Sequence, residues 1–246
     1  VAQMVPAGHI AADVGCDHGF VSIYLAQNGI CPFVYAADVR PGPLAAAKAH
    51  ILESGLSDTI MTVLSDGLKN VPVGKEVRAA CPGADVMIAA GMGGRLTVRI
   101  LEGFPEKTQQ LSWLILEPQS EVWLVRRWLG DHGFVITEEA MVAEEGKYYP
   151  VIKARNGRQE ESVSEKMAEL ERDVCEALAR AGLREDSCRE ACDRFGPVLI
   201  AQKNRVLLSF LEHTMEQDAA LLKQMPLAAE NSLKAGRIEM RRQELY

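Results

Sequence analysis

The chain has 246 residues, of which 48% are hydrophobic and 25% are charged, proportions typical of a soluble globular protein. No apolar run approaches the roughly 20 residues that a membrane-spanning helix needs, and no basic segment followed by an apolar one marks an export leader. The formal net charge of −7 argues against a generally basic nucleic-acid coat, although a local basic patch can exist within an acidic total. We therefore expect a cytoplasmic protein without a membrane partner.

The six cysteines are scattered along the chain and form no CxxC pair. Cys188 and Cys192 are four residues apart and could share a helix face, but no pattern of histidines or acids completes a zinc site. A chain of this size can bury a sufficient core without covalent links. We expect reduced thiols and no bound metal.

Residues 10 to about 155 alternate between short apolar runs, typical of buried strands, and amphipathic stretches, typical of helices. This alternation predicts an α/β fold: a mainly parallel, Rossmann-like sheet with helices on both faces. The predicted strands span 10–14, 33–38, 60–64, 85–90 and 113–116, and residues 134–143 and 148–154 form a terminal hairpin. The predicted helices span 20–28, 41–54, 121–132 and the residues after Gly94 to about 101, and residues 70–84 form a loop or broken helix.

Residues 156–246 have a different pattern, which predicts a small all-helical domain after an α/β domain of residues 1–155. From Val163 to Ala181, apolar residues recur at alternating spacings of four and three, as in coiled-coil packing. A second helical stretch spans about 206–225. These helices could grip a substrate, form a dimer or simply pack, and the pattern does not decide between these roles. A last charged helix carries Lys234, Arg237, Arg241 and Arg242.

The segment 13–19, with the sequence DVGCDHG, lies between the first predicted strand and the first predicted helix. Gly15 and Gly19 allow the backbone to turn sharply and admit a ligand against it, while the first amides of the helix remain available to that ligand. Asp17 could face the ligand or could instead cap the helix. This turn is a candidate binding site.

Acids and glycines also follow the later strands. Asp38 ends the second strand, where a carboxylate can bind both hydroxyls of a ribose, and Asp66 with Gly67 follows the third, where an acid can meet the amine of an adenine. Residues 90–94 form a second loop of small side chains. A single acid after a strand is often only a turn former, but a series at successive strand ends favours an adenosine-bearing ligand.

The spacing of the glycines decides which adenosine ligand we expect. Gly15-x-x-x-Gly19 is neither the G-x-G-x-x-G turn of dinucleotide-binding folds nor a phosphate-binding P-loop. An acid two positions before the first glycine suits a cationic cofactor without a pyrophosphate. S-adenosylmethionine fits, with Asp13 near its ammonium or sulfonium end, Asp38 at the ribose and Asp66 near the adenine.

The chain resembles the bacterial tRNA (adenine-22-N1)-methyltransferases over nearly all of residues 1–155 and, more loosely, over FGPVL (195–199) and the helices after it. The resemblance implies a class I methyltransferase domain followed by a coiled-coil C-terminal domain, with tRNA as substrate. Cys16, Gly19 and Gln119 depart from the family, which usually has a small polar residue, Ala and Asn there, and segment 158–190 is longer than expected. The shared motifs are DVGCDHG (13–19), ADVRPGPL (37–44), SDGL (65–68), AAGMGG (89–94), LILEPQ (114–119), RRWL (126–129) and EEGKYYPVI (144–152).

The implied reaction transfers a methyl group to adenine N1, which has a free lone pair at neutral pH and needs no general base. The product is cationic, so a carboxylate near the base would stabilise the transition state; Asp13 is the first candidate and Asp17 the second. N1 lies on the Watson–Crick edge, so the base must be exposed or flipped. Tyr148, Tyr149 and Phe20 are candidates to stack on it, with core packing as the alternative for Phe20.

These considerations give two sets of expected site residues. The expected cofactor-binding residues are Asp13, Gly15, Asp17, His18, Asp38, Val39, Asp66, Gly67, Ala90, Gly91, Met92 and Gly93, and the expected substrate-binding residues are Gly94, Pro118, Gln119, Arg126, Arg127, Lys147, Tyr148 and Tyr149. A methyltransferase of the same fold that acts on a small molecule or another RNA remains an alternative. One that acts on a small molecule or a protein would need no basic surface on the helices. A non-catalytic binding module and a nicotinamide oxidoreductase are less favoured, and the oligomeric state stays open between monomer and homodimer.

Overall fold

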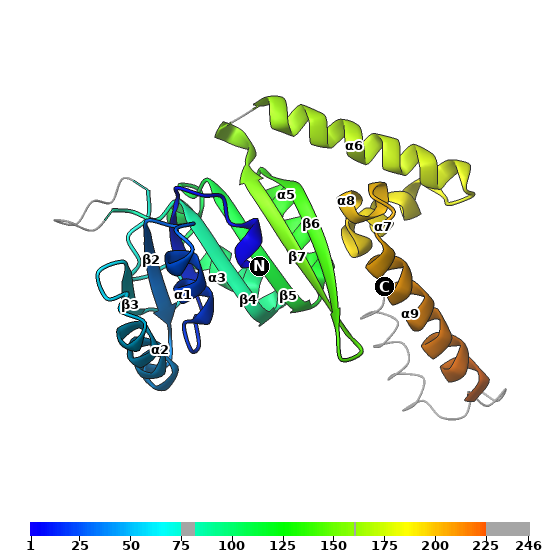
Figure 1. The fold of residues 1–246 in the computed structure, drawn as a ribbon. Helices are drawn as coiled ribbons and strands as arrows, with labels where there is room; N and C mark the ends of the chain where they lie inside the picture. Colours follow the sequence, from blue (N-terminus) through cyan, green and yellow to red (C-terminus); the bar gives the residue numbers. More distant parts are fainter. Residues whose placement is uncertain (75–81, 160, 225–246) are drawn as a thin grey trace.

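The computed structural model describes residues 1–74, 82–159 and 161–224. Figure 1 shows an α/β part, coloured blue to green, and a group of yellow and orange helices that packs beside the far edge of the sheet. No helix within these ranges combines the length and the apolar character that crossing a membrane requires.

The seven strands of the described ranges form one sheet: β1 (Ile10–Val14), β2 (Phe33–Asp38), β3 (Ile60–Leu64), β4 (Val86–Gly93), β5 (Trp113–Ser120), β6 (Phe134–Glu144) and β7 (Lys147–Asn156). The strand order is β3-β2-β1-β4-β5-β7-β6. The first five of these strands are parallel, and β7 lies antiparallel between β5 and β6. The predicted parallel sheet with a terminal hairpin is therefore confirmed. The strand order reverses between β1 and β4, the place where such sheets open a crevice at their carboxyl ends.

Helices cover both faces of this sheet, as the sequence predicts: α1 (Phe20–Gln27), α2 (Pro41–Glu53), α3 (Gly94–Gly103), α4 (Pro105–Thr108) and α5 (Val122–Asp131). On one face, Leu25 and Ile51 of α1 and α2 join a core cluster with Ile88. On the other face, Leu129 of α5 joins a cluster with Met87. Met87 and Ile88 are neighbours in β4 and point to opposite faces, as the two-residue period of a strand requires. The short helix α4 was not predicted.

Two strands run further than their apolar patterns indicate. β4 continues to Gly93 and β5 to Ser120, because their pairing resumes after register shifts, with Met92 opposite Pro118. Gly91 has a φ of +74°, which allows the strand to bulge there. The small-residue loop expected after the fourth strand is therefore the bulged end of the strand itself.

The C-terminal part contains α6 (Glu161–Arg180), α7 (Glu185–Phe195), α8 (Pro197–Ala201) and α9 (Arg205–Gln224), after a short 3-10 turn at Gly157–Gln159. α6 and α9 confirm the two predicted helical stretches. The division into two domains at residues 155 and 156 stays a prediction. The basic cluster Lys234, Arg237, Arg241 and Arg242 lies outside the described residues, as do residues 75–81 of the predicted loop.

A buried ion pair joins the helices to the sheet. Arg126 on α5 donates through Nε to Oε1 of Glu139 on β6 at 2.8 Å, and their side chains are 2% and 0% exposed. The same guanidinium donates to the carbonyls of Asp193 and Arg194 at 2.9 and 2.6 Å, and Glu139 Oε2 accepts the Val198 amide at 3.1 Å. Arg126, expected to bind substrate, is therefore an interior residue that ties α5 and β6 to α7 and α8.

Gly196, at the turn between α7 and α8, shows how closely this turn approaches Glu139. A Cβ atom at Gly196 would lie 2.5 Å from Glu139 Oε1 and 2.7 Å from its Cδ, and the residue has a φ of +87°. Both the space and the backbone conformation therefore require glycine here.

Glu139→Gln tests the strength of this link. The substitution leaves Arg126 buried without a carboxylate, so we expect the free energy of unfolding to fall by about 3–5 kcal/mol. Urea unfolding followed by circular dichroism measures the change. Glu138→Gln is the matched control, because Glu138 is 51% exposed and its pair with Lys153 should contribute less than about 1 kcal/mol. Equal losses in the two variants would contradict the assignment.

Candidate active site

The carboxyl ends of β1 to β4 surround a cavity of about 740 Å³ at the point where the strand order reverses. Ten of the twelve residues expected to bind a cofactor line this cavity; Asp13 and His18 do not. Among the described residues, no cluster of His, Cys, Asp and Glu could hold a metal ion. The lining residues are Val14, Gly15, Asp17, Asp38, Val39, Arg40, Ser65, Asp66, Gly67, Ala90, Gly91, Met92, Gly93, Leu96, Arg99 and Ile100.

The turn after β1 forms one wall of the cavity. Its Gly15 has a φ of +76° and donates its amide to the Ala37 carbonyl at 2.8 Å, and a Cβ at this position would collide with the terminal methyl of Met92. Gly19 is the N-cap of α1 and no side chain caps this helix, so the capping alternative for Asp17 is wrong. The Asp17 side chain is instead 60% exposed and lies at the cavity.

Asp38 at the end of β2 is held in a fixed orientation. Its Oδ1 accepts the Arg40 amide at 2.8 Å, its Oδ2 accepts the Asp17 amide at 3.3 Å, and the Arg40 guanidinium lies 3.7 Å from Oδ1. Each carboxylate oxygen has two lone pairs, so one accepted bond leaves each oxygen able to accept another. The arrangement suits a pair of neighbouring hydroxyl groups.

Two side chains of the loop after β3 bind its own backbone. Ser65 Oγ donates to the Gly67 carbonyl at 2.8 Å and accepts the Asn70 amide at 3.0 Å, while Asn70 Nδ2 donates to the Leu64 carbonyl at 2.8 Å. Ser65 is buried, whereas Asp66 is exposed at the cavity. These bonds shape the turn that presents Asp66 at the cavity.

Glu117 of β5 is a residue of this region to which the sequence assigned no role. Its Oε2 accepts the Gly91 amide at 2.6 Å, and its Oε1 accepts no hydrogen bond within the described ranges. Burial raises the pKa of this carboxyl, and the bond from Gly91 partly opposes that rise. Glu117 ends an apolar run just as Asp38 does, so the same strand-end reasoning could have singled it out.

Asp13 lies behind the cavity wall rather than on it. The residue is 4% exposed, and its Oδ2 accepts a hydrogen bond from Ser22 Oγ at 2.7 Å. Burial raises the pKa of Asp13 to about 6; the Ser22 hydrogen bonds lower it, and the charge of Asp38 adds a smaller rise. Of the two acids expected to act in catalysis, Asp17 is therefore the one that faces the cavity.

His18 belongs to an exposed aromatic group next to Asp17. The rings of Phe20 and His50 stack with centroids 5.2 Å apart, and His18 lies 5.9 Å from Phe20. The carbonyl of His18 lies 3.0 Å from Nδ1 of His50. Phe20 is 65% exposed, so the alternative of core packing is wrong for this residue.

The residues expected to bind substrate are distributed around the carboxyl edge of the sheet. Gln119 is exposed at the end of β5, close to Gly91, and Pro118 pairs with Met92. Gly94 is buried: a Cβ there would lie 2.5 Å from the Glu121 carbonyl, so it packs the start of α3 against the turn after β5.

Two of the remaining expected substrate residues, Tyr148 and Arg127, contact the C-terminal helices. Tyr148 places its hydroxyl 3.1 Å from Ser209 Oγ, and its ring meets Phe210 of α9 edge-on. Arg127 binds Asp193 of α7 at 2.9 Å and lies over the Trp123 ring. Lys147 and Tyr149 flank Tyr148 at the start of β7. Because β7 is antiparallel to β5, they lie at the carboxyl edge of the sheet, on the far side of β5 from the cavity.

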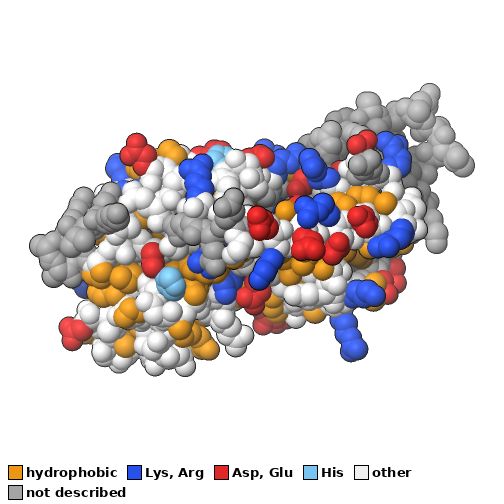
Figure 2. Space-filling view, turned by 90° about the horizontal axis from the view of Figure 1, so that it is seen from above, with side chains coloured by type: hydrophobic (Ala, Val, Ile, Leu, Met, Phe, Trp, Pro, Cys, Tyr) orange, Lys and Arg blue, Asp and Glu red, His pale blue; other side chains and the backbone are white. Residues whose placement is uncertain are grey.

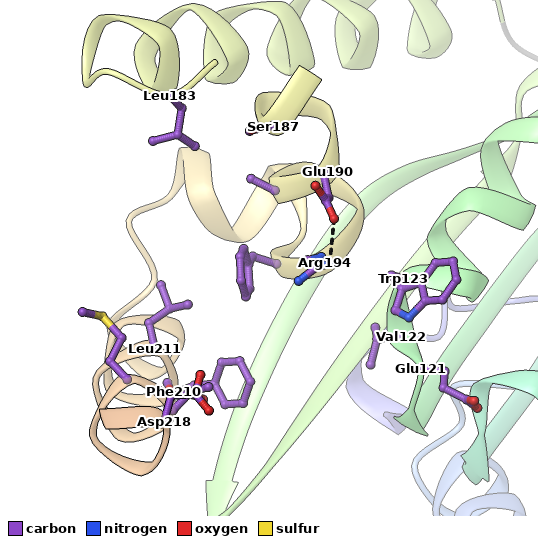
Figure 3. Close-up of a pocket in the computed structure, with 14 residues that line it drawn as sticks. Glu121, Val122, Trp123, Leu183, Ser187, Glu190, Arg194, Phe210, Leu211 and Asp218 are labelled. Carbon is purple, nitrogen blue, oxygen red and sulfur yellow. Dashed lines mark hydrogen bonds and ion pairs between the residues drawn. The ribbon is translucent and has the colours of Figure 1, made fainter. Parts of the chain in front are cut away.

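A second cavity of about 450 Å³, which the sequence does not predict, lies between the start of α5 and helices α7 and α9. Figure 3 shows Trp123 and Val122 on one side and Phe210 on the other, with the Arg194–Glu190 ion pair at 2.6 Å above them. Its lining is mainly apolar, and the residues that follow α9 are not described.

Positive charge is not concentrated on the described helices. The sequence of α6 contains six acidic and three basic residues, and Figure 2 shows both signs intermixed over this end of the molecule. The exposed arginines near the cavity are instead Arg40, Arg95 and Arg99, none of which was expected at the site. Arg95 pairs with Glu121 at 2.5 Å.

Residues 1–152 match the family model described as a methyltransferase domain. The chain belongs to this methyltransferase family. It is 28% identical over 230 residues to the tRNA (adenine(22)-N(1))-methyltransferase of Bacillus subtilis (strain 168), covering 94% of this chain and 84% of that protein.

Solved structures of similar proteins extend this comparison to the fold. The B. subtilis m1A22 tRNA methyltransferase TrmK is 27% identical with a TM-score of 0.72, over 97% of this chain and 90% of that one. The Streptococcus pneumoniae protein Sp1610, solved in complex with S-adenosyl-L-methionine, is 29% identical with a TM-score of 0.68, over 88% of this chain and 85% of that one. The predicted Rossmann-like methyltransferase fold is thus confirmed.

Asp13→Asn should remove part of the pH dependence of stability. Because burial raises the pKa of Asp13 from 3.8 to about 6, the folded chain between these values holds a proton that the unfolded chain has lost. Wild-type stability should therefore fall as the pH rises from about 4 to about 6, by up to about 3 kcal/mol from this group, and the variant should lack that fall.

Urea unfolding at several pH values in this range measures the difference. Asp58→Asn is the control, because Asp58 is exposed and should leave the slope unchanged. A wild-type slope retained in Asp13→Asn would show that Asp13 does not titrate as its burial requires.

Proposed function

We propose that the chain is a methyltransferase that uses S-adenosylmethionine to methylate N1 of adenine 22 in tRNA. The observation that carries the proposal is the extent of the similarity to the B. subtilis enzyme of that name, which spans 230 residues, whereas the methyltransferase domain model ends at residue 152. The likeness therefore includes the C-terminal helices. A methyltransferase that acts on a small molecule needs only the first part, so this extent favours the tRNA substrate.

The cavity suits S-adenosylmethionine in shape and chemistry. Asp38 can accept the two ribose hydroxyls, Asp66 can accept the adenine amine, and the glycines at positions 15 and 91 leave space for the amino-acid end. The similar S. pneumoniae protein binds this cofactor in its crystal structure. When bound, S-adenosylmethionine supplies a methyl group carried on a positively charged sulfur.

The side chains around the cavity have little proton chemistry to perform. Adenine N1 attacks with its own lone pair, so the chain needs to align the reactants and to stabilise the charge that develops on the base. Asp17 is suited to the second task, because it faces the cavity with its side chain 60% exposed. Asp13 is buried behind the cavity wall, so it can stabilise the positive charge of the cofactor only at a distance, without contacting it.

The target base must leave its stack to reach the cavity. Phe20, which is 65% exposed and stacks on His50, offers a flat surface on which the base can stack, and the exposed Gln119 lies next to Gly91. Tyr148 is less available, because it is only partly exposed and already contacts Ser209 and Phe210. We assign the stacking role to Phe20.

Binding of a polyanion needs positive charge near the cavity, since phosphate contacts dominate such affinity. Arg40, Arg95 and Arg99 provide it beside the strand ends, whereas the described helices α6, α7 and α9 carry more acidic than basic residues. A tRNA substrate is consistent with a cytoplasmic protein.

Incubation with S-adenosylmethionine and an unmodified tRNA transcript, followed by nucleoside analysis, tests the proposal. We expect 1-methyladenosine at about one equivalent per tRNA, located at position 22 by primer extension. The control transcript carries guanine at position 22 and should gain no methyl group.

Methylation of neither transcript by a chain that binds S-adenosylmethionine would reject the tRNA assignment and favour a small-molecule substrate. Methylation at a different adenine would retain the reaction and correct the position. Absence of cofactor binding would reject the proposed function as a whole.

A further inference from the structure

Lys107 lies on α4, outside the lining of the strand-end cavity, and its ammonium group binds three backbone carbonyls of one loop. Nζ donates to the carbonyls of Leu68, Lys69 and Val71 at 3.1, 3.2 and 2.7 Å. An ammonium has three N–H donors, so it can bind several carbonyls at once. Three carbonyl dipoles that converge on one point repel one another, and a cation at that point offsets the repulsion.

The loop that Lys107 holds continues directly from the cavity wall. Leu68 follows Asp66 and Gly67, which line the cavity, and the Lys69 amide donates back to the Asp66 carbonyl at 3.2 Å. Gly67 has a φ of +55°, and a Cβ there would lie 3.1 Å from Ile100 of α3. The loop therefore packs against α3 on the side of the cavity, and the Lys107 ammonium binds its backbone on the other side.

We propose that Lys107 is a positioning residue for cofactor recognition: it fixes the loop so that Asp66 meets the exocyclic amine of the adenine ring. This inference rests on the proposed function, because it takes S-adenosylmethionine as the ligand. Lys107 itself does not line the cavity, so its effect reaches the ligand only through the loop.

The role differs from that of a simple structural tie between α4 and the loop. A structural tie affects stability and all ligands alike, whereas a positioning residue changes how well the site distinguishes adenine from a ring without the amine. A site that places an acceptor opposite an amine disfavours an analogue that lacks it, because the acceptor then loses its donor. The ratio of the two affinities therefore reports the placement of Asp66.

The test uses Lys107→Met in the full chain, since methionine keeps the length of the side chain but removes the charge and the donors. Calorimetry measures the affinity for S-adenosylhomocysteine and for S-inosylhomocysteine, which has an oxygen in place of the adenine amine. Steady-state methylation of tRNA measures kcat and the KM for S-adenosylmethionine. Lys69→Met is the matched control, because its side chain is exposed on the same loop.

In Lys107→Met we expect the KM for S-adenosylmethionine to rise at least fivefold, with kcat and the KM for tRNA within twofold of wild type. The preference for S-adenosylhomocysteine over its inosine analogue should fall at least threefold, while Lys69→Met should retain wild-type values. An unchanged preference in a Lys107→Met protein that binds both ligands would overturn the inference. Failure of the wild-type chain to bind S-adenosylhomocysteine would instead overturn the proposed function.

Discussion

Parallel pairing of β1 with β2 on one side and with β4 on the other is the constraint on which the site depends. Because the order reverses there, the connections that leave β1 and β4 run to opposite faces and open a crevice between them. The glycine turn after β1 and the bulge at Gly91 both border this crevice, and the Met92 methyl lies where a Cβ of Gly15 would be. The cavity therefore requires small residues at these points.

A second constraint joins the helices to this sheet. Glu139 and Arg126 are both charged and almost fully buried, so neither tolerates the loss of the other. Their hydrogen bonds to α7 and to the start of α8 place the C-terminal helices beside β6. Tyr148 of β7 also contacts Phe210 of α9. The C-terminal helices therefore lie along the β6 edge of the sheet.

Much of the fold and of the cavity lining could be predicted, because strand periodicity and glycine at a strand end are local signals. The first three strands match their predicted bounds, and Asp38 and Gly15 lie at the cavity as expected. The remaining features depend on contacts between residues that are far apart in the sequence. Arg126 looks like a surface arginine until β6 brings Glu139 against it, and nothing near Lys107 in the sequence indicates a loop 36 or more residues earlier. The place of Asp13 behind the wall likewise follows from α1, whose Ser22 binds it.

Titration calorimetry of S-adenosylhomocysteine with the wild-type chain and with Asp38→Asn tests the central claim most directly. The claim is that the strand-end cavity holds the cofactor with its ribose on Asp38, whose two oxygens are already oriented by backbone amides. We predict one ligand per wild-type chain and an affinity lower by about 1–3 kcal/mol in the variant, the scale of hydrogen bonds to a charged group. An unchanged affinity in a folded Asp38→Asn protein would contradict the account.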